Sequence, residues 1–328
     1  MQIGLKNLDR YLSQNDNFII TAHSSPDGDA LGSEIAFKEF LTKIGKKSFI
    51  VNSDPPDEIY DFIDFDKEIK VWDEGLKLKL KLDKYNFFFL DVNNSKNIGS
   101  LESYFNLSTH NLFIIDHHFA EEKLQQKNFI RPEVPAASQL IYEIFDYYQI
   151  SLSFKSAQAI YAGILFDTGS FHFPKTSSRT FEIASKCLEY KVDPFFVYEQ
   201  LWSQNSLTSF ALQNKVMAGM QLLANNRLAL IKLTPEMLVE TKAKYEEAQN
   251  FINIPLSLKT VKACAFIKFN PEKQEIRVGL RSKGDLDVAQ IASKYKGGGH
   301  KNAAGFRSDL SFEETCQIIS RDMENLFV

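Results

Sequence analysis

Residues 17–30 read NFIITAHSSPDGDA, and this stretch decides the fold class. It opens with an apolar run that predicts a strand over Asn17–Thr21. A short polar loop then leads into a helical pattern over Ala30–Ile44, where apolar residues recur every three or four positions. A strand that leads through a loop into a helix begins a βα unit, and repeated βα units form a parallel sheet covered by helices.

The same alternation continues through the N-terminal half of the chain. The further elements predicted there are strands over Ser48–Val51, Phe87–Asp91 and Leu112–Asp116 and helices over Ser138–Tyr148 and Ser156–Leu165. The expected fold class is therefore α/β, with a parallel sheet in the N-terminal domain. Ligands of such sheets bind at the carboxyl ends of the strands, so the residues that follow each strand are the first candidates for a functional site.

The C-terminal part of the chain shows a different pattern. Its predicted elements are strands over Arg227–Leu233, Thr260–Phe269 and Glu275–Leu280 and helices over Pro235–Ala248 and Leu286–Tyr295. They indicate a second, smaller α+β domain. We expect a catalytic domain over residues 1–190, a helical linker over 191–212 and a second domain over 213–328, with the active site in the cleft between the domains.

The composition excludes several classes of protein. Of the 328 residues 44% are hydrophobic and 24% are charged, as in soluble globular proteins, and the apolar runs fall far short of the roughly 18 residues that a membrane helix needs. No secretory signal follows Met1, so we expect a cytoplasmic protein without membrane association. The three cysteines suit reduced thiols in the core better than a disulfide framework or a zinc site, because Cys187, Cys264 and Cys316 lie far apart.

Aspartates and histidines follow four apolar runs of the N-terminal half. The loop after the first strand contains His23, Asp27 and Asp29, the run FFFL leads to Asp91, the run LFII leads to Asp116-His117-His118, and the run ILF leads to Asp167. In a parallel sheet these segments would deliver their last residues to one edge. For Asp27-Gly28-Asp29 alone, an Asx turn with Asp29 as a helix N-cap is the simpler interpretation.

Carboxylates that converge in this way need counter-charge, because several buried anions cannot all stay ionised. Two divalent ions would cancel the negative charges of Asp27, Asp29, Asp91 and Asp167. An oxygen and nitrogen ligand set without cysteine fits Mn²⁺ best, ahead of Mg²⁺, Co²⁺ and Zn²⁺. Because a metal pair activates water and stabilises the leaving oxygen in phosphoryl transfer, the pattern predicts a two-metal phosphoesterase.

A glycine-rich stretch of the second domain has the chemistry of an anion site. Gly297-Gly298-Gly299-His300-Lys301 follows the last predicted helix, and Arg281-Ser282 follows the last predicted strand. Backbone N–H groups of glycines can approach a phosphate closely, and the basic side chains add further donors. A purely structural turn is the alternative for this loop. Phe306, just beyond it, is a candidate for stacking on a base.

Taken in order, these motifs resemble the DHH phosphoesterase family with its DHH-associated C-terminal domain. The matching motifs are His23-xxx-Asp27-x-Asp29, Asp91, Asp116-His117-His118, Asp167-Thr168-Gly169 and Gly297-Gly298-Gly299-His300. The resemblance spans almost the whole chain and is closest to the short members that degrade nanoRNA and also hydrolyse 3′-phosphoadenosine 5′-phosphate (pAp).

The resemblance implies a role for each residue of the site. One manganese ion would be held by His23, Asp27 and Asp91, and the other by Asp29, Asp91, His117 and Asp167, so that Asp91 bridges the two. As catalytic residues beside Asp91, His118 would face the scissile phosphate, and Asp116 would support the metal-binding histidine. The substrate would be held by Arg281, Ser282, Gly298, Gly299 and His300. Many members carry arginine where this chain has Asn97 and His172.

The activity implied by the resemblance is hydrolysis of short RNA oligonucleotides to mononucleotides and of pAp to AMP. A cyclic-dinucleotide or linear-dinucleotide phosphodiesterase would use the same metal core, although the cyclic-dinucleotide members usually carry membrane and sensory segments. A single-strand DNA exonuclease of the RecJ type would carry additional nucleic-acid-binding domains, and a related pyrophosphatase lacks the Gly-Gly-Gly-His type of domain. A non-catalytic nucleotide-binding protein is the alternative from a different class. The sequence leaves open whether the chain forms a homodimer.

Overall fold

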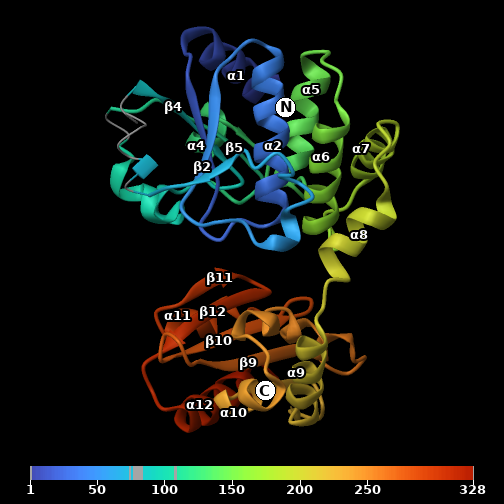
Figure 1. Cartoon of the computed structure of the whole chain (residues 1–328). Helices are drawn as coiled ribbons and strands as arrows, with labels where there is room; N and C mark the ends of the chain where they lie inside the picture. Colours follow the sequence, from blue (N-terminus) through green and yellow to red (C-terminus); the bar gives the residue numbers. More distant parts are fainter. Residues whose placement is uncertain (1, 74, 77–83, 107–108, 328) are drawn as a thin grey trace. The chain divides into compact units, whose positions relative to one another are not determined.

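The computed structural model describes residues 2–73, 75–76, 84–106 and 109–327 (Figure 1). The chain divides into two compact units, residues 1–204 and 205–328. The division lies inside the segment 191–212, which contains α8 (Pro194–Trp202) and the first half of α9 (Leu207–Ala218). Each unit has its own sheet and is described separately.

The first unit is built on a parallel sheet of six strands, which confirms the expected fold class. The order is β3-β2-β1-β4-β5-β6, and every neighbouring pair is parallel. The strands are β1 (Phe18–Thr21), β2 (Ser48–Asn52), β3 (Ile69–Val71), β4 (Asn86–Leu90), β5 (Leu112–Asp116) and β6 (Phe129–Ile130). The chain order of the strands reverses between β1 and β4, and ligands of open α/β sheets bind at the carboxyl ends of the strands beside such a reversal.

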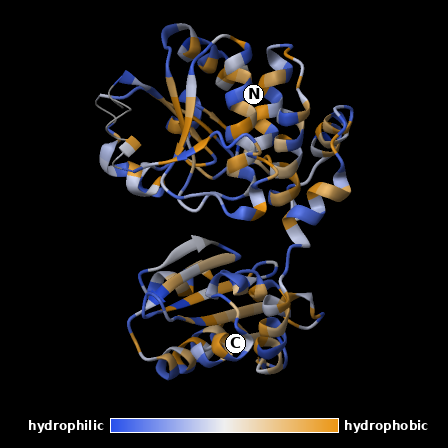
Figure 2. Ribbon diagram, viewed as in Figure 1, coloured by the Kyte–Doolittle hydropathy of each residue, from blue (hydrophilic) through white to orange (hydrophobic). Residues whose placement is uncertain are grey.

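Alternating side chains of the strands enter two separate apolar cores. Phe18, Ile20 and Phe88 belong to the larger core, whereas Ile19 and Phe87 belong to the core on the opposite face. Figure 2 shows apolar residues along the strands and on the helices that cover them. The larger core includes residues of α1 (Gln2–Gln14), α2 (Gly28–Lys43), α5 (Ala137–Tyr147), α6 (Phe154–Asp167), α7 (Ser178–Leu188) and α8. The short helix α4 (Glu122–Lys127) contributes Leu124 to the opposite face.

The second unit is a mixed sheet with helices on both faces. The strand order is β11-β12-β10-β9-β8-β7, and β8 and β9 are the parallel pair among otherwise antiparallel neighbours. The strands are β7 (Gln221–Leu223), β8 (Leu228–Leu233), β9 (Ala263–Asn270), β10 (Glu275–Ser282), β11 (Gly298–His300) and β12 (Ala303–Ser308). The helices are α9, α10 (Pro235–Thr241), α11 (Ala289–Lys294) and α12 (Phe312–Glu324). This arrangement confirms the expected second α+β fold.

Several predicted boundaries in the second unit were wrong. The helix predicted over Pro235–Ala248 ends at Thr241, because Lys242 adopts a left-handed conformation (φ 56°) that interrupts the helix. The helix predicted from Leu286 begins at Ala289. The glycine-rich stretch that was expected to be a loop pairs as the antiparallel strands β11 and β12.

Two expectations about the whole chain can also be compared with the structure. All three cysteines are buried and unpaired, which confirms that they are core thiols. Among the described residues, no helix has both the length and the apolar character that a membrane span requires.

Candidate metal centre

The loop that carries His23 is held by groups outside it. Three backbone N–H groups around the histidine donate to external acceptors: Ala22 to Asn52 Oδ1 (3.3 Å), Ser24 to Asn97 O (2.7 Å) and Ser25 to Asp54 Oδ2 (2.8 Å). The loop follows β1 directly, so it lies at the carboxyl edge of the sheet. His23 therefore projects from a backbone that is fixed on both sides.

Asp27 is the N-cap of α2 and also faces His23. Its Oδ1 accepts from the N–H groups of Asp29 (3.0 Å) and Ala30 (3.1 Å), which have no partner within the helix. Its Oδ2 lies 3.8 Å from His23 Nε2. The simpler interpretation of Asp27-Gly28-Asp29 taken alone put the cap at Asp29, but the structure places it at Asp27, where one oxygen caps the helix and the other remains directed at the histidine.

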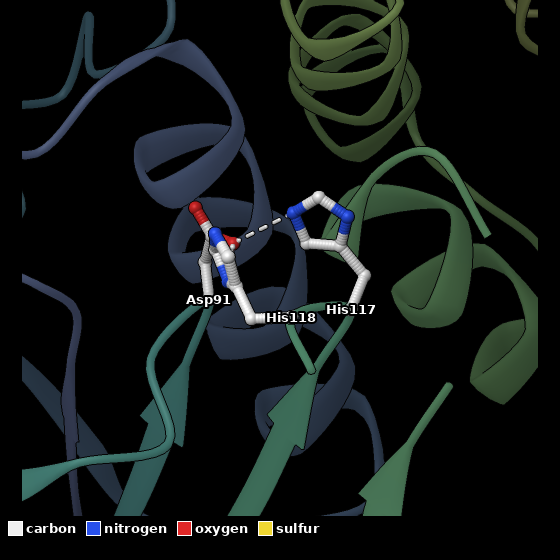
Figure 3. Close-up of side chains that lie close together, drawn as sticks. All are labelled: Asp91, His117 and His118. Carbon is white, nitrogen blue, oxygen red and sulfur yellow. Dashed lines mark ion pairs between the residues drawn. The ribbon is translucent and has the colours of Figure 1, made fainter. Parts of the chain in front are cut away.

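Asp91 lies between the two histidines that the sequence singled out as ligands, His23 and His117, and Figure 3 shows its contact with His117. Its Oδ2 lies 3.5 Å from His23 Nε2 and its Oδ1 lies 3.2 Å from His117 Nε2. The residue follows β4 in a left-handed conformation (φ 55°), which few residues other than glycine adopt and which aspartate tolerates better than most. This conformation directs both oxygens into the cluster, where the side chain is only 3% exposed.

Asp29 receives its hydrogen bonds from the start of another helix. Its Oδ2 accepts from the N–H of Ala137 (2.6 Å) and its Oδ1 from the N–H of Ser138 (2.9 Å), in the first turn of α5. Helix N-termini favour negative charge, but the burial of Asp29 and the charges of Asp91 and Asp167 outweigh this effect and raise the pKa of its carboxyl group. Asp29 Oδ2 also lies 3.9 Å from His117 Nε2.

His117 Nε2 is surrounded by carboxylates. It lies 3.0 Å from Asp167 Oδ2, in addition to its contacts with Asp91 and Asp29. Asp167 is the last residue of α6, the helix that was expected over Ser156–Leu165, so it reaches the cluster from a helix and not from a sheet strand. The backbone segment ILF that precedes Asp167 is helical, and the approach of α6 to α2 brings the carboxylate to the sheet edge.

The approach of α6 to α2 depends on two glycines. A Cβ atom at Gly163 would lie 2.8 Å from Asp29 Oδ1 and would also collide with Ser138 Oγ. A Cβ atom at Gly32 would collide with the carbonyl oxygen of Ala159. The absence of side chains at these two positions therefore allows α6 to place Asp167 beside Asp29.

Asp116 holds the ring of His118. Its Oδ1 accepts from His118 Nδ1 (2.8 Å) and from the backbone N–H groups of His117 (2.8 Å) and His118 (3.2 Å). The expectation from the resemblance was support of the metal-binding histidine, His117, whereas the carboxylate contacts only the backbone of that residue within the described part of the chain. His118 is also close to the cluster, with Nδ1 3.5 Å from Asp91 Oδ1.

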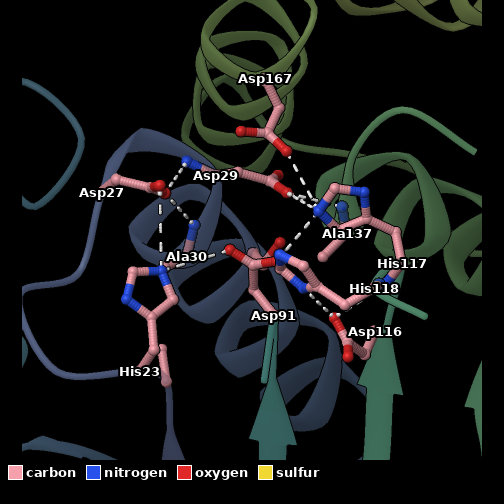
Figure 4. Close-up of polar contacts among 12 residues, drawn as sticks. His23, Asp27, Asp29, Ala30, Asp91, Asp116, His117, His118, Ala137 and Asp167 are labelled. Carbon is pink, nitrogen blue, oxygen red and sulfur yellow. Dashed lines mark hydrogen bonds and ion pairs between the residues drawn. The ribbon is translucent and has the colours of Figure 1, made fainter. Parts of the chain in front are cut away.

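These side chains form overlapping groups that could hold metal ions (Figure 4). In each group the potential ligand atoms lie within 4.8 Å of one another, and the groups are His23/Asp27/Asp91, Asp29/His117/Asp167 and Asp91/His117/His118. The structure thus brings together all six residues that were proposed as ligands. Asp91 Oδ1 and His117 Nε2 are buried and have no hydrogen-bond partner in the described part of the chain. Buried polar atoms are rarely left without a partner, so these atoms fit a bound cation.

The clustered charges shift the pKa values of carboxylates and imidazoles alike. Burial raises the pKa of Asp27 to about 6, and the charges of Asp91 and Asp167 add to this rise. Burial lowers the pKa of His23, but hydrogen bonding and charge from Asp91 outweigh it and raise the pKa to about 10. Burial also lowers the pKa of His117, but the nearby carboxylates of Asp167 and Asp91 outweigh it and raise the pKa. For Asp91 burial raises the pKa, but hydrogen bonding to His117 and His23 outweighs it and lowers the pKa. The raised pKa values of Asp27, His23 and His117 show that the cluster is rich in negative charge, which divalent cations would balance.

The predicted substrate residues all lie in the second unit. Arg281 is on β10, where its Nη1 donates to the Leu280 carbonyl oxygen (3.1 Å), and within the described residues it has no ion pair with a carboxylate. Burial lowers the pKa of this guanidinium group, so an anionic ligand would stabilise its charge. Ser282 Oγ is already engaged, since it donates to the Leu286 carbonyl oxygen (2.6 Å) and accepts from Asn302 (2.9 Å).

The backbone groups of Gly298 and Gly299 are candidate contacts for a ligand, and the side chain of His300, also predicted to bind substrate, lies outside the described part of the structure. Gly298, Gly299 and His300 form β11, and Gly299 has a φ of 140°, a conformation that side chains disfavour. A Cβ atom at Gly298 would meet no atom within 4 Å, so the space beside it is open. The segment therefore leaves room for a ligand to approach the backbone closely.

A buried carboxyl group behind the cluster was missed by sequence reasoning. Glu34 on α2 is fully buried, and its Oε2 accepts from Asn52 Nδ2 (2.8 Å), the same amide that holds the His23 loop. Burial raises the pKa of Glu34 to about 8, which the hydrogen bond from Asn52 only partly offsets. The signal in the sequence was an acidic residue among apolar ones in a helical pattern, GSEIAF, which indicates a charge on a buried face.

Comparison with known proteins agrees with this geometry. The model of the N-terminal domain of the DHH family matches residues 17–164, and the model of the DHHA1 domain matches residues 229–325. The chain is 28% identical over 328 residues to "Bifunctional oligoribonuclease and PAP phosphatase NrnA" of Bacillus subtilis, which covers 97% of this chain and 96% of that protein.

Two further relatives cover almost the whole chain. It is 29% identical over 311 residues to "Probable bifunctional oligoribonuclease and PAP phosphatase NrnA" of Streptococcus mutans, which covers 95% of each chain. The crystal structure of an exopolyphosphatase-related protein from Bacteroides fragilis superposes with a TM-score of 0.91 at 26% identity, over 100% of this chain and 98% of that chain.

Proposed function

Because this chain belongs to the DHH family and carries a DHHA1 domain, we propose that it hydrolyses short oligoribonucleotides to mononucleotides and pAp to AMP. The relatives from Bacillus subtilis and Streptococcus mutans carry these two activities in their names and match along nearly their whole lengths. The observation that supports the proposal most strongly is the pair of ligand groups that converge from opposite sides on Asp91. We assign catalysis to residues 1–190 and substrate binding to residues 213–328, joined by the linker 191–212.

The proposed metal centre would use six side chains. His23, Asp27 and Asp91 would hold one ion, and Asp29, Asp91, His117 and Asp167 would hold the other. A bound pair of divalent ions lowers the pKa of water and stabilises charge on the oxygens of a phosphate in transfer. The oxygen and nitrogen donors, without sulfur, favour Mn²⁺.

His118 and Arg281 would act on the substrate itself. Asp116 holds His118 by its Nδ1, and the carboxylates of Asp116 and Asp91 outweigh the effect of burial and raise the pKa of the ring. When the ring is protonated it carries a second donor, Nε2–H, which can hydrogen-bond to a phosphoryl oxygen and stabilise the charge that grows on it. Arg281 and the backbone N–H groups of Gly298 and Gly299 would bind a neighbouring phosphate of the nucleotide. The cytoplasmic location and the oligomeric state stay predictions.

An activity panel on the full-length protein tests the proposal. We expect hydrolysis of pApA, of longer short oligoribonucleotides and of pAp with Mn²⁺, and loss of each activity when EDTA removes the metal. Release of mononucleotides is followed by ion-exchange chromatography and release of phosphate by a colorimetric assay. Turnover that survives chelation contradicts the two-metal proposal. Faster cleavage of cyclic di-AMP or of a long DNA strand than of pApA would instead favour the cyclic-dinucleotide or RecJ-type alternative.

A further inference from the structure

Phe119 is an exposed aromatic residue beside the proposed active site. It follows His118 directly in the chain, and its side chain is 84% exposed. The segment leaves the carboxyl end of β5, the same edge of the sheet at which Asp91 follows β4. A phenyl ring in water contributes nothing to the apolar cores of the unit, so burial in the core does not explain its position.

The backbone on both sides of Phe119 is anchored. On one side the N–H of His118 donates to Asp116 Oδ1 (3.2 Å). The carbonyl oxygen of Phe119 itself accepts from Asn93 Nδ2 (3.2 Å), which comes from the segment after β4. On the other side Ala120 is buried in the smaller core, and its carbonyl oxygen accepts from Gln125 Nε2 (2.6 Å). The exposed ring is therefore mounted on a fixed backbone, and little conformational entropy is lost when a ligand packs against it.

Phe306, the aromatic residue that the sequence singled out for base stacking, is not available for it. Its side chain is only 8% exposed, and its ring stacks on Tyr295 (centroids 4.7 Å apart) within the core of the second unit. Phe173, which lies beyond Asp167, is half-exposed, but its ring packs so closely on Gly169 that a Cβ atom there would lie 2.6 Å from the ring. Phe119 thus combines an open ring face with a position next to His118.

We propose that Phe119 is a stacking platform for the base of the nucleotide whose phosphate is cleaved. This inference rests on the proposed function and adds a base-binding position to it. Every nucleobase presents an apolar π-face, so a stack on Phe119 would favour nucleotides over simple phosphate esters without selecting one base. The substrate class is therefore a nucleotide or short oligonucleotide with a base next to the scissile phosphate.

Kinetics with and without a base test the proposal. We measure KM and kcat for pAp and for ribose 3,5-bisphosphate, which has the same phosphates but no base, with Mn²⁺ and the full-length protein. Loss of a base stack to alanine weakens binding about five- to 150-fold, so Phe119→Ala should raise KM for pAp within that range. KM for the base-free bisphosphate should not change. Equal effects on the two substrates, or no effect on pAp, would overturn the proposal.

Fluorescence gives a second readout that does not depend on turnover. Phe119→Trp keeps an aromatic face, so its KM for pAp should stay below that of Phe119→Ala, and the added tryptophan emission should be quenched by AMP but not by ribose 5-phosphate. An unquenched Phe119→Trp signal overturns the proposal and favours a protein surface as the partner of the ring. If the wild-type protein hydrolyses no nucleotide, the proposed function fails, and the quenching measurement still decides whether a base stacks on this residue.

Phe154 provides the matched control. It is also an exposed phenylalanine, at 48%, but it is the first residue of α6, the helix whose last residue is Asp167. The 14 residues of this helix place the two ends roughly 20 Å apart. Phe154→Ala should therefore leave both KM values unchanged, and Phe154→Trp should show no quenching by AMP.

Discussion

Asp91 is the residue on which the proposed metal centre depends most. Its two oxygens face different histidines, His23 and His117, and it is common to two of the three potential ligand groups. Its left-handed backbone conformation is unfavourable for most side chains and is retained here by the surrounding structure. A residue in such a conformation that also joins two ligand groups fits the role of a bridging ligand.

The bridging role predicts different effects for two aspartate-to-asparagine substitutions. Asp91→Asn should weaken the binding of both Mn²⁺ ions, because it removes a charge that both groups share. Asp27→Asn should weaken the binding of only one ion, by at least about tenfold. Substitution of residues that merely hydrogen-bond to a metal ligand already lowers metal affinity by about that factor. Isothermal titration with Mn²⁺ and the electron paramagnetic resonance signal of the bound ions would measure this. Asp285→Asn, on a fully exposed side chain of the second unit, is the control. Two ions bound with unchanged affinity in Asp91→Asn would exclude the bridge.

The raised pKa of Glu34 predicts that the stability of the protein depends on pH. Burial raises the pKa of this carboxyl group from its ordinary value to about 8 in the folded protein. The group then keeps its proton in the folded state between pH 5 and 8 but loses it on unfolding, so its contribution to stability is complete at acidic pH and falls as the pH rises towards 8.

The substitution Glu34→Gln tests this linkage. Glutamine keeps the oxygen that accepts from Asn52 but cannot ionise, so the free energy of unfolding should fall less between pH 5 and 8 in the variant than in the wild type. Urea unfolding at pH 5, 6.5 and 8 measures the difference. Parallel pH profiles for the two proteins would show that Glu34 is already ionised at pH 5.

At the scale of elements, the packing of α2 against α6 forms half of the candidate site. Asp29 lies in the first turn of α2 and Asp167 ends α6, and the glycines Gly32 and Gly163 let the two backbones approach closely. The start of α5 completes the arrangement by donating two N–H groups to Asp29. Three helices from distant parts of the chain therefore position one potential ligand group.

The close approach of these helices makes Gly163 sensitive to the smallest side chain. Gly163→Ala places a methyl group against Ser138 and Asp29, and overpacking of this kind typically destabilises a protein by about 1–3 kcal/mol. We also expect weaker binding of the ion assigned to Asp29, His117 and Asp167. Urea unfolding and Mn²⁺ titration measure the two effects. Gly219→Ala is the control, because its Cβ atom would make only ordinary contacts at 3.7 and 3.8 Å. A Gly163→Ala protein with normal stability and two normal ions would contradict the argument.

At the scale of the whole molecule, the proposed metal-binding residues and the proposed substrate-binding residues belong to different units. All proposed metal ligands lie in residues 1–204, whereas the proposed substrate residues lie in residues 205–328. The units have separate apolar cores. Metal binding and substrate binding should therefore be separable by substitution.

Arg281→Gln tests this separation. The substitution removes a half-buried cation without a carboxylate partner in the described residues, so KM for pAp should rise, by roughly 10-fold or more for the loss of a charged hydrogen bond to phosphate. The number and affinity of bound Mn²⁺ ions should not change. Arg321→Gln, which alters an exposed residue of α12, is the control. A loss of Mn²⁺ binding in Arg281→Gln would show that the two functions are not separable.

The elements that sequence reasoning predicted share a strong local pattern. β5 was predicted to the residue because LFII is a continuous apolar run between polar neighbours, and the long helices α2, α5 and α6 were predicted to within a few residues. The short strands β3 and β6 were not predicted, since two or three residues are too few to show a periodicity. The hairpin of β11 and β12 was missed because its glycines have no side chains that could show the alternation of polar and apolar residues typical of a strand.

The α/β class, the order of the ligand residues and the chemistry of a carboxylate and histidine cluster could all be predicted from the sequence, because they follow from residue types and from neighbours a few positions away. Long-range packing, in contrast, brings Asp167 beside Asp29 and His117 and leaves Phe119 exposed. The same is true of the hydrogen bond between Asp29 and Ala137, which joins residues 108 positions apart. Such contacts depend on how helices pack across the sheet, and no local pattern of residues encodes that packing.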